Sequence, residues 1–78
     1  MNKYIYRLNK NILKTEEGKT YTAYDVEAWT VKNQTYCLAE SIPNVFLEYE
    51  RAKNFIDSCN FLEISLVHLM DVIEDELS

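Results

Sequence analysis

The sequence predicts an α+β fold, in which a three-stranded antiparallel meander is followed by two helices packed on one face of the sheet. The first 42 residues are rich in Tyr, Thr, Val and Ile and alternate between polar and apolar positions, as strands do. From residue 45 onward, apolar residues recur every three or four positions, which is helical spacing. Strands followed by helices indicate a layered α+β arrangement, and a chain of 78 residues allows a single domain over 1–78.

The first two strands are expected over residues 3–14 and 20–31. Gly18 lies between them and supplies the left-handed conformation that a short hairpin loop requires. We expect Lys14 to pair with Thr20, because this register sets apolar residues against apolar ones and opposite charges against each other. A shift by one residue mixes the two faces of the sheet.

This register defines an apolar face and a polar face. The pairs that follow from it are Tyr6–Ala28, Leu8–Val26, Lys10–Tyr24, Arg7–Glu27 and Asn9–Asp25. It also sets Ile5 opposite Trp29 on the polar face. An apolar pair on an otherwise polar sheet face is typical of a docking surface, whereas a twist or bulge that half-buries Trp29 is the structural alternative.

The third strand is expected over residues 35–42 and ends at Pro43. The sequence leaves open which of two alternating sets of side chains points inward. We favour the set that buries more apolar area, although it also turns Glu40 inward. The favoured set is Tyr36, Leu38 and Ile42, and the other is Cys37, Ala39 and Ser41.

The two helices are expected over residues 45–59 and 66–77. Asn44 is a suitable N-cap for the first helix, and Asn60 is a suitable left-handed residue at its end. Ser65 is the expected N-cap of the second helix. The second apolar stripe consists of Leu66, Leu69, Met70, Ile73 and Leu77.

Composition and charge exclude several classes of protein. Ten aromatic residues argue against disorder, and neither a transmembrane run nor the apolar core of a signal peptide is visible. Cys37 and Cys59 fit reduced thiols in a cytoplasmic protein. Residues 1–19 carry a net charge of +3 and residues 20–78 carry −8, which sum to −5. This acidic balance argues against direct binding of nucleic acid.

Three segments resemble a small family of uncharacterised proteins from Gram-positive anaerobes, a domain of unknown function. They are Tyr21-Thr22-Ala23-Tyr24, Cys59-Asn60 and the run His68-Leu69-Met70-Asp71-Val72-Ile73-Glu74-Asp75. The chain departs from the family at Asp25, where glycine is usual, and at Leu66, where proline is frequent. The resemblance implies a compact cytoplasmic domain and carries over no functional residue.

The sequence contains no recognisable catalytic set. His68 is the single histidine and lies three residues from Asp71, which suits a hydrogen bond but supplies no second metal ligand. Gly18 stands alone, so no glycine-rich phosphate loop is present. We therefore expect a non-enzymatic protein without cofactor or metal.

The favoured function is a small cytoplasmic interaction or regulatory module that binds a protein, with a homodimer also open and no membrane contact. Two candidate surfaces follow. One is the polar sheet face at Ile5, Arg7, Glu27 and Trp29, and the other is the last helix at His68, Asp71, Glu74 and Asp75. The alternative function is an acidic inhibitor that mimics nucleic acid and occupies a basic groove, such as that of a defence nuclease.

Overall fold

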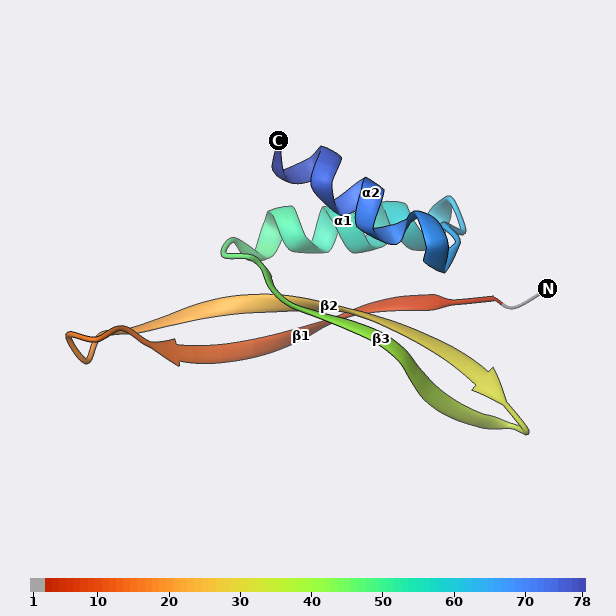
Figure 1. Cartoon of the computed structure of the whole chain (residues 1–78), viewed down its shortest axis with the longest axis horizontal. Coiled ribbons are helices and arrows are strands. Elements are labelled where there is room, and N and C mark those ends of the chain that lie inside the picture. Colours follow the sequence, from red (N-terminus) through yellow and green to blue (C-terminus); the bar gives the residue numbers. More distant parts are fainter. Residues whose placement is uncertain (1–2) are drawn as a thin grey trace.

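A computed structural model describes residues 3–78, and its elements follow the predicted order (Figure 1). The three strands form one antiparallel sheet in the order β1-β2-β3, and both helices lie on the same side of it. The predicted α+β meander with two helices on one face is therefore confirmed. The elements are β1 (Ile5–Lys14), β2 (Thr20–Lys32), β3 (Thr35–Phe46), α1 (Tyr49–Phe61) and α2 (Leu66–Leu77).

The β1–β2 hairpin has the predicted register over ten consecutive pairs, from Ile5 opposite Trp29 to Lys14 opposite Thr20. Its loop closes through a hydrogen bond from the amide of Gly18 to the carbonyl of Thr15, at 3.0 Å. Gly18 has a φ of +86°, the left-handed conformation that the loop requires. β1 begins two residues later than predicted.

The β2–β3 hairpin turns through two residues only. Lys32 pairs with Thr35, and the residues between them, Asn33 and Gln34, have φ values of 50° and 66°. Two left-handed central residues define a type I′ turn, whose twist matches that of the strands it joins. The short turn fixes the pairing of everything that follows in β3.

A bulge at Ala39 divides β3 into two parts with opposite orientation. Ala28 pairs with Glu40, but the next residue, Trp29, pairs with Leu38, so Ala39 is an extra residue in β3. Our favoured set of inward residues is therefore wrong for the first part of the strand: Tyr36 and Leu38 face away from the helices, and Cys37 faces toward them. It is right for Ile42, which pairs with Val26 and packs, partly buried, against the core.

A second irregularity extends β3 beyond its predicted end at residue 42. Asn44 adopts a φ of 54°, and its amide donates to the Asp25 carboxylate at 2.8 Å instead of to a neighbouring strand. Pairing then resumes between Phe46 and Tyr24. Asn44 is thus a strand residue and not an N-cap. The first helix begins at Tyr49, four residues later than predicted, because residues 45 and 46 stay with the sheet.

The end of α1 also differs from the prediction. The helix continues to Phe61, and the left-handed residue is Glu63 and not Asn60. Asn60 remains helical, and its side-chain amide bonds to the backbone of Tyr6 in β1. The residue therefore ties the helix to the sheet. α2 has the predicted bounds.

The hydrophobic core lies between the sheet and the helices. Leu69 and Ile73 of α2 are buried in it, as the sequence predicted. The hydroxyl group of Tyr6 donates to the carbonyl of Ile64, and burial raises the pKa of this phenol. The core residues are Tyr6, Val26, Ala28, Phe46, Ala52, Phe55, Ile56, Cys59, Leu69 and Ile73.

The molecule is elongated. Its radius of gyration is 13.6 Å, whereas a compact chain of this length has about 11.5 Å. Figure 1 shows the reason: both hairpin ends extend past the helices, and no helix in the described residues covers the opposite face of the sheet. The core is therefore one-sided.

Candidate protein-interaction surface

A cluster of apolar side chains lies on the sheet face that carries no helix. The register aligns Ile5, Trp29 and Leu38 across the three strands, and Val31 with Tyr36 beside them. Ile5 is 38% exposed, Val31 53%, Tyr36 63% and Leu38 49%. We call these five residues the outer patch.

Trp29 is the centre of the outer patch. It is half-buried, with Ile5 on one neighbouring strand and Leu38 on the other. Its indole N–H donates to Oε1 of Glu27 at 3.0 Å. Because this donor already has a partner, the ring can be covered by an apolar surface without leaving a buried polar atom unsatisfied.

Two opposite charges border the outer patch. Arg7 and Glu27 lie directly opposite each other on β1 and β2, as predicted. Arg7 is exposed, and among residues 3–78 no carboxylate forms an ion pair with it. The border therefore offers both a guanidinium and a carboxylate to a partner.

The same face becomes polar toward the first hairpin, around Asp25. This carboxylate is only 6% exposed, and it accepts hydrogen bonds from the side-chain amides of Asn9 and Asn11 and from the backbone of Asn44, at 3.1, 2.7 and 2.8 Å. Burial on its own would raise the pKa of Asp25, but the three donors outweigh burial and lower it. Asp25 holds the irregular part of β3 in place.

The second predicted surface lies on the other side of the molecule. His68, Asp71, Glu74 and Asp75 are all exposed on α2. The structure therefore does not bring the four sheet candidates and the four helix candidates together. They form two separate surfaces, one on the sheet and one on the helical layer.

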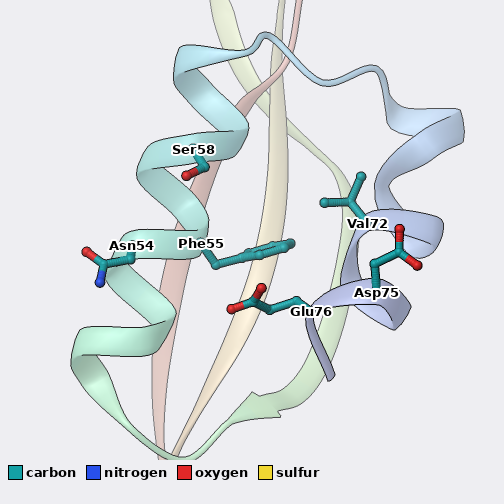
Figure 2. Close-up of a pocket in the computed structure, with 6 residues that line it drawn as sticks. All are labelled: Asn54, Phe55, Ser58, Val72, Asp75 and Glu76. Carbon is teal, nitrogen blue, oxygen red and sulfur yellow. The ribbon is translucent and has the colours of Figure 1, made fainter. Parts of the chain in front are cut away.

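A shallow cleft separates the two helices. Figure 2 shows the ring of Phe55 projecting from α1 toward α2, with Val72 and two carboxylates on the opposite wall. The cleft has a volume of about 300 Å³. One of its carboxylates, Glu76, pairs with Arg51 at 3.5 Å. The lining residues are Asn54, Phe55, Ser58, Val72, Asp75 and Glu76, so His68 and the cysteines lie outside it.

Three members of the outer patch, Val31, Tyr36 and Leu38, are absent from the predicted surface. The signal for them was the short second turn. Pairing Lys32 with Thr35 across two loop residues sets Val31 opposite Tyr36 and places them on the face of Trp29. Choosing the inward face of β3 by apolar area alone missed this constraint.

Three further observations concern metal ligands, membrane-spanning helices and the thiol groups. Within residues 3–78, no group of three His, Cys, Asp or Glu side chains is arranged to hold a metal ion. In the same residues, neither helix has the length and apolarity needed to cross a membrane. Cys37 and Cys59 are free thiols, and Cys59 is buried.

Comparison with known proteins matches the chain to no family model, no curated protein and no solved structure. The resemblance to the uncharacterised family from Gram-positive anaerobes therefore stays a prediction. Function has to be inferred from the surfaces themselves.

Proposed function

We propose that the protein is a small non-enzymatic interaction module that binds a protein through the outer patch, and that it acts in the cytoplasm. The observation that carries this proposal is the state of Trp29. Its ring lies between Ile5 and Leu38 on an uncovered sheet face, and its N–H is already bonded to Glu27. A rigid aromatic residue with a satisfied polar atom is typical of an interface anchor.

The surroundings of Trp29 support the same proposal. The other four members of the patch are each more than one-third exposed, so they gain free energy when a partner removes them from water. Arg7 and Glu27 at the border supply the polar rim that protein interfaces have. The free thiols support a reducing compartment.

A capture experiment tests this proposal. The wild-type chain and a Leu38→Glu variant are immobilised and exposed to a lysate of the cells that express the chain, and bound proteins are identified by mass spectrometry. Leu38 is 49% exposed, so the variant should fold. We expect a partner that the wild type retains and the variant loses. Equal retention by both chains contradicts a role for the outer patch.

A second candidate function is an acidic inhibitor that mimics nucleic acid. The observation that favours it is the composition of α2, which has no Lys or Arg and exposes Asp71, Glu74 and Asp75. Salt separates the two candidates. Binding through carboxylates should weaken steeply between low and high ionic strength, whereas binding through the outer patch should change little.

A further inference from the structure

We propose that the partner of the outer patch is a second copy of this chain, so that two sheets pack face to face with the helices on the outside. This inference rests on the proposed function and names the partner for it. A face that carries an apolar cluster and both signs of charge is complementary to itself, as a two-fold symmetric interface requires.

The distribution of charge over the molecule favours a second copy. The register places one basic residue, Arg7, and two acidic ones, Asp25 and Glu27, on the outer sheet face, and Asp25 is buried with three donors. Apart from Asp25, this face therefore presents one positive charge, on the exposed Arg7, and one negative charge, on the half-buried Glu27. Residues 44–78, in contrast, contain eight acidic and two basic residues, a net charge of −6. A strongly basic partner is therefore complementary in charge to the helical layer and not to this face.

The acidic layers do not prevent such a dimer. Two packed sheets lie about 10 Å apart, and each helical layer lies about 10 Å beyond its own sheet, so the acidic layers of the two copies are about 30 Å apart. This separation exceeds the Debye length of about 8 Å at physiological ionic strength. The repulsion between the two copies is therefore largely screened.

The dimensions of the sheet also match a dimer. The view in Figure 1 is along the shortest axis and shows the sheet below the helices, so the sheet face lies along the two directions in which the whole molecule measures 47 and 18 Å. The product of these extents, about 850 Å², is the largest area that the face can have, and it is comparable with the roughly 800 Å² that one partner contributes to a standard interface. Packing against a copy would also give the exposed side of this one-sided fold a second layer.

Sedimentation equilibrium from micromolar to submillimolar concentration tests the proposal. We expect the wild type to approach twice the 9.2 kDa of one chain, and both Leu38→Glu and Leu38→Lys to remain monomeric. The lysine variant is the decisive one. It makes the chain less negative, so general charge repulsion predicts stronger association, whereas a buried outer patch predicts none.

Val67→Glu is the matched control. Val67 lies on α2 and is 81% exposed, so this variant carries the same change of charge as Leu38→Glu on the opposite side of the molecule. It should dimerise like the wild type. Circular dichroism verifies that each variant is folded. Trp29 emission should shift to shorter wavelength as the wild-type concentration rises, and it should stay constant in both Leu38 variants.

Three outcomes overturn the dimer: a wild type that is monomeric at every concentration, a dimer that survives Leu38→Lys, or a dimer that only Val67→Glu abolishes. The first outcome leaves the proposed function separately testable. If the monomeric wild type still captures a distinct protein that Leu38→Glu loses, the outer patch is an interface for another chain. If that capture is also absent, the proposed function fails together with the dimer.

Discussion

Asn60 and Tyr6 are joined by two hydrogen bonds between the end of α1 and the edge of β1. The amide of Tyr6 donates to Oδ1 of Asn60 at 2.8 Å, and Nδ2 of Asn60 donates to the carbonyl of Tyr6 at 2.9 Å. The side-chain amide thus makes the same pair of bonds that a neighbouring strand would make at this position. The side chain of Asn60 therefore occupies the hydrogen-bonding edge of β1 at the point where the end of α1 lies against this strand.

Replacing Asn60 by Ala should lower the free energy of unfolding by about 1–3 kcal/mol, because two backbone groups of Tyr6 lose their partners. Urea denaturation followed by circular dichroism measures the change. Asn54→Ala is the control, since Asn54 is exposed on the same helix. Equal stability of the two variants would show that water replaces Asn60 at no cost.

Asp25 should make stability depend on pH. Its folded-state pKa lies below the ordinary value of 3.8, so the unfolded chain binds the proton more tightly. The stabilisation is therefore complete above about pH 5 and is lost as the pH falls through the folded-state pKa. We expect Asp25→Asn to be about 2 kcal/mol less stable than the wild type at neutral pH, because hydrogen bonds to a charged acceptor are the stronger ones.

The difference between the wild type and Asp25→Asn should shrink as the pH falls below 3.8, because the unfolded wild-type chain takes up the proton first, and it should be smallest below the folded-state pKa, where the native carboxyl is neutral as well. Urea midpoints of both chains across this range measure it. The other carboxyl groups are common to the two chains and cancel in the comparison. Parallel pH profiles would contradict the role given to Asp25.

Glycine at position 34 should stabilise the turn that Asn33 and Gln34 form. Gln34 has a φ of 66°, which costs a residue with a side chain about 1 kcal/mol. Gln34→Gly should therefore raise the free energy of unfolding by about 0.5–1 kcal/mol, since Asn-Gly is the preferred sequence for this turn. Gln34→Ala keeps a Cβ atom and should not stabilise. A gain of equal size from alanine would point to the side chain and not to the backbone.

Leu69 and His68 are neighbours on α2 with different environments. Leu69 is 1% exposed and belongs to the core, whereas His68 is exposed. Leu69→Ala should cost about 2–4 kcal/mol, because it leaves a cavity in the core, and His68→Ala should cost far less. Chemical denaturation compares the two. If Leu69→Ala were as stable as wild type, α2 would be a detachable arm.

Cys59 should react only after unfolding. It is buried in the core, and burial, with a contribution from Glu76, raises the pKa of its thiol to about 11. The reactive thiolate is therefore rare at neutral pH. We expect iodoacetamide to modify at most Cys37 in the native protein and both cysteines in denaturant, as counted by mass spectrometry. A Cys59→Ser variant identifies which thiol reacts. Rapid native labelling of Cys59 would contradict its burial.

The first hairpin was predictable because its constraints agree. Alternation, charge pairing and Gly18 all indicate one register, and the structure has it through ten pairs. The bounds of α2 were also predictable, because Ser65 and the apolar stripe mark them clearly. Local signals suffice where each of them favours the same arrangement.

The second half of the sheet was less predictable, because tertiary contacts override its local signals. Pro43 and Asn44 indicate the end of a strand and the start of a helix, but Asp25, distant in sequence, accepts the amide of Asn44 and lets β3 continue to Phe46. Burial of Phe46 against Phe55, with ring centroids 5.3 Å apart, favours the longer strand. The hydrogen bonds between Asn60 and the sheet were not predicted for the same reason, since the partner residue, Tyr6, lies 54 positions away in the sequence.

The bulge at Ala39 makes the length of β3, and not only its residue types, part of how the sheet is built. The two-residue turn sets Tyr36 and Leu38 opposite Val31 and Trp29 on the outer face, and Ala39 is the extra residue that precedes the pairs Glu40–Ala28 and Ile42–Val26. Deleting Ala39 would bring Glu40 directly after Leu38 and so keep all of these pairs, because only the unpaired residue is lost. The bulge is thus the position at which β3 can lose one residue without turning Ile42 away from the core.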